Sequence, residues 1–205
     1  FGGLTVARAI IDLLPSEDIV YFGDTSRYPY GPQPLEEVKS YSQQISDYLI
    51  GKYDVKMIVI ACNTASAAAE ANLRDFTEIP IVGVIEPGAQ AVAEVSATKR
   101  IGVIGTVGTI NSQAYDNAIK EISRENIELV SVACPGFVEF VERGEFEGEQ
   151  VNILADRLLA PVIQADVDAL LLGCTHYPYL ARVIGESVSE DVVLVSSADE
   201  TAFAV

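Results

Sequence analysis

The chain has 205 residues, of which 49% are hydrophobic, and its 30 acidic and 13 basic side chains give a formal net charge of -17. A chain of this length and apolar content is expected to be globular, with one large or two small domains that bury a core. The acidic charge repels nucleic-acid backbones and anionic membranes, so direct binding to either is not expected.

Cysteine usage indicates a reducing compartment. The three cysteines, Cys62, Cys134 and Cys174, are an odd number and include no CxxC pair, which argues against a disulfide framework. No apolar run approaches the roughly 18 to 20 residues of a membrane span, and no segment has the pattern of a signal peptide. We therefore expect a cytoplasmic protein.

The first half of the chain alternates predicted helices and strands. A helix is predicted over 4–14, where apolar residues recur at helical spacing, and a strand over 19–22. The connection 25–34 is rich in Pro and Gly and is typical of a loop that builds a site past a strand end. The further elements predicted in this half are helix 35–50, strand 57–61, helix 64–76, strand 81–85 and helix 86–95.

The pattern begins again after a short polar break at 96–99, which is the candidate domain boundary. The elements predicted there are strand 101–104, helix 111–124, strand 128–133, helical segments 137–142 and 148–163, strand 169–172, a short helix, strand 192–195 and a final helix. This alternation predicts an α/β fold with two similar doubly wound parallel-sheet domains, residues 1–97 and 98–190. Residues 191–205 are expected to return to the first domain.

Two stretches share one pattern, in which an apolar run ends at a small residue and a cysteine and a polar residue follow. They are MIVIACNTAS at 57–66 and LLLGCTHYP at 170–178. Short apolar runs bounded by turn residues are typical of buried parallel strands, and ligands bind at the carboxyl ends of such strands. We expect Cys62 and Cys174 to face a site in the cleft between the domains.

Several cysteine chemistries compete at this point. Zinc binding is weakly supported, because Cys174 and His176 are separated by one residue and no CxxC or HxxxH spacing accompanies them. Redox chemistry needs a resolving cysteine that nothing in the sequence places nearby. A cysteine hydrolase using Cys174 and His176 would leave Cys62 idle.

One chemistry uses both thiols, namely the inversion of an amino acid at Cα. One base removes the proton from one face while an acid returns a proton to the other. Sulfurs about 3 to 3.5 Å from Cα on opposite faces would be roughly 7 Å apart. Pyridoxal phosphate, the usual organic cofactor for racemisation, needs a Schiff-base lysine, and the five lysines fall in helices or polar connections. A cofactor-free route is therefore favoured, and no metal is expected.

Motifs along nearly the whole chain resemble the glutamate racemase family. They are GGLTVARAI at 2–10, GDT and PYGP at 23–25 and 29–32, IACNTAS at 60–66, IGVIGT and TINS within 101–112, CP with FV and VERG within 134–144, and LGCTHYP at 172–178. The histidine after the second CT is similar to glutamate racemases, whereas aspartate racemases carry an acidic residue there. The resemblance implies two α/β domains, no cofactor, and supply of D-glutamate for peptidoglycan.

The resemblance also implies roles for individual residues. Cys62 resembles the thiol that acts on D-glutamate and Cys174 the thiol that acts on L-glutamate, with His176 assisting Cys174. Residues that resemble substrate-contacting groups of the family are Tyr30, Gly31, Asn63, Thr64, Thr106, Thr109, Thr175 and the acidic Glu142. Cys134 is interpreted as a packing residue and Tyr28 as a structural tyrosine.

The chain also departs from the family pattern. Family members begin with a strand that ends in an Asp-Ser pair before the glycine turn, so the resemblance implies truncation at both ends and makes activity of this chain uncertain. Expected partners are glutamate as a small-molecule substrate and a second copy of the chain in a homodimer. Two other hypotheses are a related racemase with another substrate and a regulatory protein that binds DNA gyrase, as some family members do.

Overall fold

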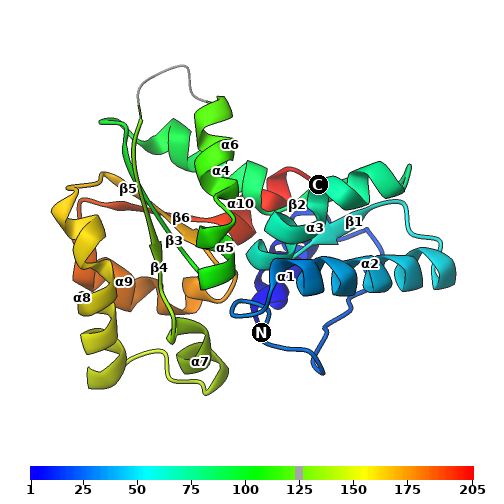
Figure 1. The fold of residues 1–205 in the computed structure, drawn as a ribbon, viewed down its shortest axis with the longest axis horizontal. Coiled ribbons are helices and arrows are strands. Elements are labelled where there is room, and N and C mark those ends of the chain that lie inside the picture. The colour runs from blue at the N-terminus through cyan, green and yellow to red at the C-terminus, as the bar shows by residue number, and fades with distance from the viewer. Residues whose placement is uncertain (123–126) are drawn as a thin grey trace.

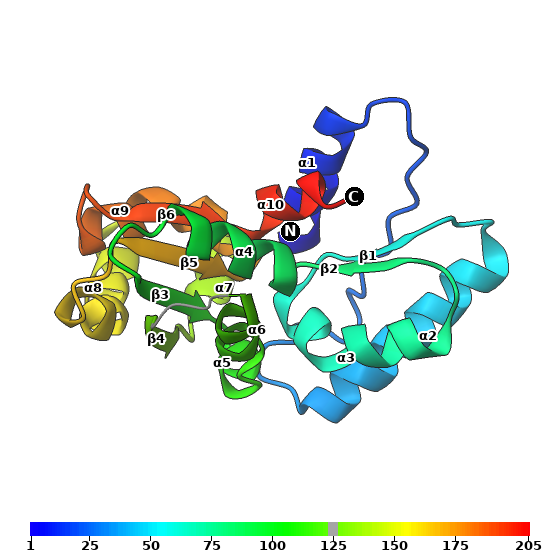
Figure 2. The ribbon, with the colours of Figure 1, turned by 90° about the horizontal axis from the view of Figure 1, so that it is seen from above.

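The structure is a computed structural model that describes residues 1–122 and 127–205. It is an α/β fold with two parallel sheets placed side by side, a four-stranded sheet in one half and a two-stranded sheet in the other (Figure 1). Both chain ends lie near the junction of the two halves when the molecule is seen from above (Figure 2). The prediction of an α/β fold with parallel sheets is confirmed.

Most predicted elements are present within a few residues of their expected bounds. The first part of the chain contains α1 (Gly2–Leu13), α2 (Leu35–Lys52), β1 (Ile58–Ile60), α3 (Asn63–Phe76), β2 (Ile81–Gly83) and α4 (Ile85–Val95). The second contains β3 (Arg100–Gly105), α5 (Val107–Asn111), α6 (Ala114–Ile122), β4 (Glu128–Ala133), α7 (Phe137–Glu142), α8 (Glu149–Gln164), β5 (Ala169–Gly173), a 3-10 turn η1 (Tyr177–Leu180), α9 (Ala181–Val188), β6 (Val193–Ser196) and α10 (Ser197–Phe203). The helix predicted over 111–124 corresponds to α6, its last two residues lie outside the described ranges, and the short helix α5 before it was not predicted.

The four-stranded sheet has the order β4-β3-β5-β6, with all strands parallel. Alternate residues of the central strands face opposite layers of helices. Leu170 and Leu172 of β5 pack with α8 and α9, whereas Ala169 and Leu171 pack with α4 and α6. Because both faces are covered, β5 is apolar along its whole length, which explains the continuous run in the sequence.

The two-stranded sheet pairs β1 with β2 and contains no third strand among the described residues. The prediction of a strand over 19–22 is wrong, because the segment is extended but hydrogen-bonds to no strand. Its side chains from Ile19 to Phe22 are 41 to 48% exposed. A strand requires a neighbour to satisfy its backbone groups, and this segment has none. The two sheets are therefore unequal in size, and the two halves are less similar than expected.

Helix α4 packs with the four-stranded sheet although it precedes the polar break at 96–99. Ile85, Ala89 and Val92 share a core with Ile101 and Val103 of β3 and with other residues of that sheet. The boundary after residue 97 stays a prediction, and the packing of α4 favours an earlier division. The last helix, α10, packs on α1 beside Val84.

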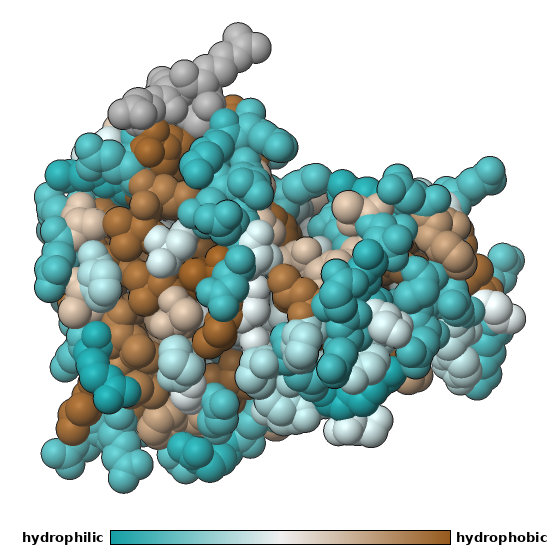
Figure 3. All heavy atoms as spheres, in the orientation of Figure 1, coloured by the Kyte–Doolittle hydropathy of each residue, from teal (hydrophilic) through white to brown (hydrophobic). Residues whose placement is uncertain are grey.

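Apolar side chains also gather at the surface over the four-stranded sheet, where the edge strand β4 is mostly half-buried (Figure 3). Among the helices within residues 1–122 and 127–205, none combines the length and apolar content needed to cross a bilayer.

Candidate active site

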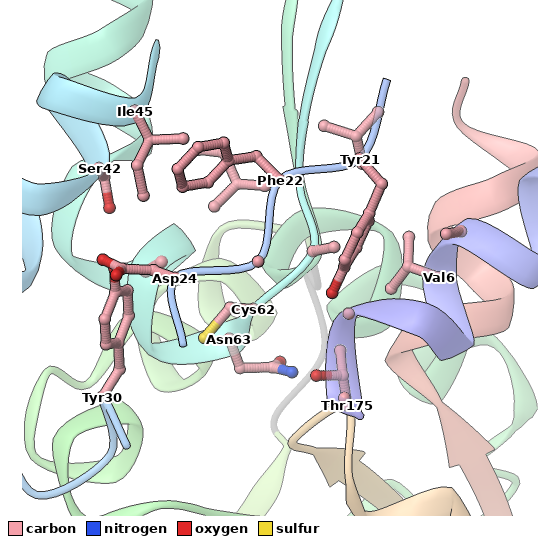
Figure 4. Close-up of a pocket in the computed structure, with 18 of the residues that line it drawn as sticks. Val6, Tyr21, Phe22, Asp24, Tyr30, Ser42, Ile45, Cys62, Asn63 and Thr175 are labelled. Carbon is pink, nitrogen blue, oxygen red and sulfur yellow. The ribbon is translucent and has the colours of Figure 1, made fainter. Parts of the chain in front are cut away.

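Cys62 and Cys174 lie at the carboxyl ends of strands in different sheets and line the same hollow. Cys62 follows β1 and occupies the N-cap position of α3, whereas Cys174 follows β5 directly. The hollow has a volume of about 1600 Å³ and is lined by α1, the segment 16–32, β1 and the turns after β3, β4 and β5. Figure 4 shows its wall around Cys62 and Asn63, with Asp24 and Tyr30 on one side and Thr175 on the other.

The environment of Cys62 combines desolvation with hydrogen-bond donors. Burial raises the pKa of the Cys62 thiol above its ordinary value, while hydrogen bonds from the backbone of Ala65 and Thr64 and from the Thr64 hydroxyl act in the opposite direction. These donors arise because α3 begins at Asn63, which leaves its first N–H groups without partners inside the helix. The same helix end is suited to an anionic ligand.

Cys174 forms a chain of polar contacts with His176 and Glu142. Its Sγ lies 3.8 Å from Nδ1 of His176, and Nε2 of His176 lies 2.6 Å from Oε1 of Glu142. Burial raises the pKa of Cys174 to about 12, and burial also lowers the pKa of His176 although Glu142 opposes this shift. Burial would raise the pKa of Glu142, but its hydrogen bond with His176 acts in the opposite direction, and the pKa lies below its ordinary value.

The connection before α2 is held over the hollow by Asp24. The Tyr30 hydroxyl donates to Oδ2 of Asp24 at 2.5 Å, and Nε of Arg27 lies 2.6 Å from the same oxygen. The Arg27 guanidinium lies over the Tyr41 ring of α2, 4.3 Å from its centroid. Burial, followed by the bond to Asp24, raises the pKa of Tyr30. Tyr30 is therefore a neutral hydrogen-bonding group at the edge of the site.

Three buried threonine hydroxyls join the two halves. Thr64 of α3 lies 2.9 Å from Thr106 and 3.2 Å from Thr109, and the last two hydroxyls are 3.0 Å apart. Thr106 also caps α5, and the Gly108 amide donates to the Gly31 carbonyl at 2.9 Å. We refer to the three hydroxyls as the threonine triangle.

The start of α1 rests on the turn that follows β5. A Cβ added at Gly2 would lie 2.5 Å from Nδ1 of His176 and 2.6 Å from Oγ1 of Thr175, so no larger residue fits there without displacement. The Thr5 hydroxyl lies 2.7 Å from the Gly2 carbonyl and 3.1 Å from the Thr175 carbonyl. The positive end of the α1 dipole is thus directed at the hollow.

Asn63 is 2% exposed, yet its side chain reaches the hollow. Its Oδ1 accepts from the Tyr115 hydroxyl at 2.5 Å, and its Nδ2 lies 3.3 Å from the Ser197 hydroxyl. The amide nitrogen points toward Thr175 on the opposite wall (Figure 4). Asn63 therefore connects the turn after β1 to residues of the other half of the molecule.

The fold brings the predicted site residues together. All of them line the hollow except Thr109, which is joined to it through the threonine triangle. Cys134 is 1% exposed within the apolar core, consistent with packing, although it also touches the hollow. Tyr28 is 43% exposed and lines the hollow, and its interpretation as a structural tyrosine stays a prediction.

Two residues in contact with this site were not predicted from the sequence. Asp24 follows the apolar segment 19–22 just as the cysteines follow their strands, and this position was a signal that could have identified it. Tyr115 gave no signal, because an aromatic residue on a helix is usually part of the core. Within residues 1–122 and 127–205, no three His, Cys, Asp or Glu side chains are grouped to hold a metal ion.

The chain is similar to known proteins over nearly all of its length. It matches the protein family described as Asp/Glu/Hydantoin racemase over residues 4–205. It is 52% identical to a glutamate racemase of Geobacter metallireducens over 201 residues, covering 98% of this chain and 74% of that protein.

Solved structures show the same relationship. The structure of glutamate racemase isoform RacE1 from Bacillus anthracis has a TM-score of 0.95 and 44% identity, with 99% of this chain and 76% of that chain covered. A glutamate racemase from Francisella tularensis, solved in complex with D-glutamate, has a TM-score of 0.92 and 36% identity, with coverage of 99% and 75%.

Proposed function

The chain belongs to the Asp/Glu/Hydantoin racemase family, and on that premise we propose that its two thiols invert glutamate at Cα without a cofactor. The protein is an isomerase that acts on amino acids, a glutamate racemase by similarity. The observation that carries the mechanism is the placement of Cys62 and Cys174 on one hollow, each at the end of a different sheet.

The proton transfer requires one thiolate and one thiol. The thiolate removes the Cα proton, the electron pair of the broken C–H bond stays on the substrate, and the opposite thiol donates its proton to the other face. Each turnover therefore exchanges the protonation states of the two sulfurs. We assign Cys62 to deprotonation of D-glutamate and Cys174 to deprotonation of L-glutamate.

His176 and Glu142 can assist Cys174. Burial keeps His176 neutral, so Nδ1 can accept the thiol proton at 3.8 Å while Nε2–H donates to the Glu142 carboxylate at 2.6 Å. The carboxylate stabilises the imidazolium that would form. Cys62 has no histidine beside it, since His176 is the only histidine in the chain. Its thiolate would instead be stabilised by the hydrogen-bond donors at the start of α3.

Substrate binding is assigned to groups around the thiols. Glutamate presents two carboxylates and an ammonium, and the start of α3, the start of α1 and the turn after Cys174 supply N–H and hydroxyl donors. Tyr30, Gly31, Thr64, Thr106 and Asn63 complete the wall, and Thr109 supports it through the threonine triangle. These donors are directed at the position where negative charge would develop on the substrate, which is the arrangement that stabilises such charge.

The biological context belongs to the proposal. D-glutamate made by this reaction would supply peptidoglycan synthesis, and a cytoplasmic location is in keeping with the three free cysteines. A homodimer stays a prediction, which light scattering of the purified chain would test.

The test is proton exchange at Cα in deuterated buffer, without added pyridoxal phosphate, starting separately from each enantiomer of glutamate. We expect deuterium incorporation and inversion in the unaltered chain and at least a hundredfold loss in Cys62→Ala and Cys174→Ala. Cys134→Ala is the matched control and should retain exchange. Absence of exchange in the unaltered chain, or exchange that survives both cysteine substitutions, contradicts the proposed function. A panel of other amino acids separates glutamate from alternative substrates.

A further inference from the structure

Tyr115 contacts both thiol-bearing turns from a position outside the hollow. It lies on α6, is 1% exposed, and is not among the residues that line the hollow. Its hydroxyl lies 2.5 Å from Oδ1 of Asn63, the residue after Cys62. A Cβ added at Gly173, the residue before Cys174, would lie only 2.9 Å from Cε2 of the Tyr115 ring. One side chain thus spans the two strand ends that carry the sulfurs.

The hydrogen bonds around Asn63 favour one orientation of its amide, although the Ser197 hydroxyl lies at similar distances from both amide atoms, 3.3 Å from Nδ2 and 3.4 Å from Oδ1. The Tyr115 hydroxyl has a single hydrogen, and Asn63 Oδ1 at 2.5 Å is a closer acceptor than the Val84 carbonyl at 3.3 Å. The Ser197 hydroxyl donates to the Leu172 carbonyl at 3.2 Å, so it can accept from Asn63 Nδ2 at 3.3 Å. The second N–H of the Asn63 amide then remains available on the side of the hollow, facing Thr175 (Figure 4).

We propose that Tyr115 is a positioning residue for substrate binding, which holds the Asn63 amide so that its free N–H is presented to the substrate. The inference rests on the proposed function. Without the Tyr115 hydroxyl the amide loses the contact that distinguishes its oxygen from its nitrogen, and the reversed orientation would present an acceptor to an anionic substrate. Burial raises the pKa of Tyr115, so its hydroxyl remains a donor at neutral pH.

The first experiment is Tyr115→Phe, which removes the hydroxyl and keeps the ring against Gly173. We expect KM for both enantiomers to rise about tenfold, with kcat changed less than about threefold, because a binding contact is weakened. Since the two enantiomers have equal free energy, kcat/KM must fall by the same factor in both directions. An unchanged KM with a lower Tm would show a structural role only and would overturn the proposal.

A double-mutant cycle tests whether Tyr115 acts through Asn63. In the Asn63→Ala background, Tyr115→Phe should change KM less than about twofold. If the two residues act independently, the KM changes of the single variants will multiply in the double variant, and that result would overturn the proposal. Tyr177→Phe is the matched control, since Tyr177 is 0% exposed and its hydroxyl donates to the Cys134 carbonyl at 3.1 Å. Tyr177→Phe should change Tm by about as much as Tyr115→Phe does. Its effect on KM should multiply with the effect of Asn63→Ala, as expected for two residues that act independently.

A second readout does not depend on activity. In ¹⁵N-labelled protein the side-chain amide signals of Asn63, assigned from Asn63→Ala, should exchange with solvent about tenfold faster in Tyr115→Phe. Unchanged amide exchange overturns the inference even if the chain is inactive, whereas absent Cα exchange in the unaltered chain counts against the proposed function alone. If Tyr115→Phe does not fold, Ser197→Ala takes its place, because it removes the other hydroxyl that contacts the amide. In the Asn63→Ala background Ser197→Ala should change KM less than about twofold, and multiplied effects would overturn the proposal.

Discussion

The Nε2 atom of His176 lies 2.6 Å from Oε1 of Glu142, which joins two residues 34 positions apart in the chain. The opposite ring nitrogen faces the sulfur of Cys174. The two contacts place an imidazole and a carboxylate beside Cys174 that Cys62 lacks, so in the proposed mechanism different groups would support the two proton transfers.

Replacing the charge at Glu142 should act on His176 first. In Glu142→Gln the pKa of His176 should fall further below its ordinary value, because burial remains and the opposing carboxylate is lost. The His176 ring is the only imidazole in the chain, so its Cε1–H resonance can be titrated without assignment. We also expect about a tenfold loss of kcat with L-glutamate. Glu145→Gln, at an exposed residue paired with Arg143, is the control, and equal titration curves for all three proteins would contradict the assignment.

Cys174 should make the chain less stable in alkali. Its pKa is raised from 9.0 to about 12, so the folded chain holds this proton after the unfolded chain has lost it. The contribution is present below pH 9.0 and is lost as the pH rises toward 12. For one group the slope is up to about 1.4 kcal/mol per pH unit.

The measurement is the free energy of unfolding in urea at several pH values above 8. Cys174→Ala should lower stability at pH 8 but flatten its decline with pH. Cys134→Ala should flatten it similarly, since burial raises the pKa of that thiol to about 12 as well. Curves parallel to that of the unaltered chain would show that neither thiol is held protonated.

The threonine triangle should contribute both stability and binding. Thr106→Val leaves the buried hydroxyls of Thr64 and Thr109 without one partner and removes the side-chain cap of α5. We expect the free energy of unfolding to fall by about 1 to 3 kcal/mol and KM for glutamate to rise. Thr106→Ser keeps the hydroxyl and should stay within about 1 kcal/mol of the unaltered chain. A Thr106→Val variant with unchanged stability and unchanged KM would contradict this role of the hydroxyl.

Tyr30→Phe should weaken substrate binding with little loss of stability. The hydroxyl that donates to Asp24 is removed, while Arg27 still pairs with the same carboxylate at 2.6 Å, so the connection stays folded but is held less firmly. We expect KM to rise about threefold to tenfold with Tm nearly unchanged. Tyr41→Phe removes an exposed hydroxyl that donates to Glu37 and keeps the ring beneath Arg27, so it should leave KM unchanged. A Tyr30→Phe variant with an unchanged KM would contradict this role.

The sequence predicted most elements because their signals are local. The apolar run of β5 and the polar residues after it identify both a buried strand and the position of Cys174 at its end. The segment 19–22 has the same apolar character, but a strand exists only if another strand pairs with it, and local composition carries no information about that partner. Helix α4 shows the same limit, because its amphipathic pattern predicts a helix but not which sheet it covers.

Residue order alone determined that this is an α/β chain with cysteines at two strand ends, since hydrophobic period and turn residues act over a few positions. Only the tertiary structure decided which side chains complete the site. Glu142 could have belonged to a solvated acidic segment, and Tyr115 could have been a core residue without a polar contact. Their contacts with His176 and Asn63 depend on how helices and sheets pack, and packing is set by the shape and burial of surfaces distant in the chain.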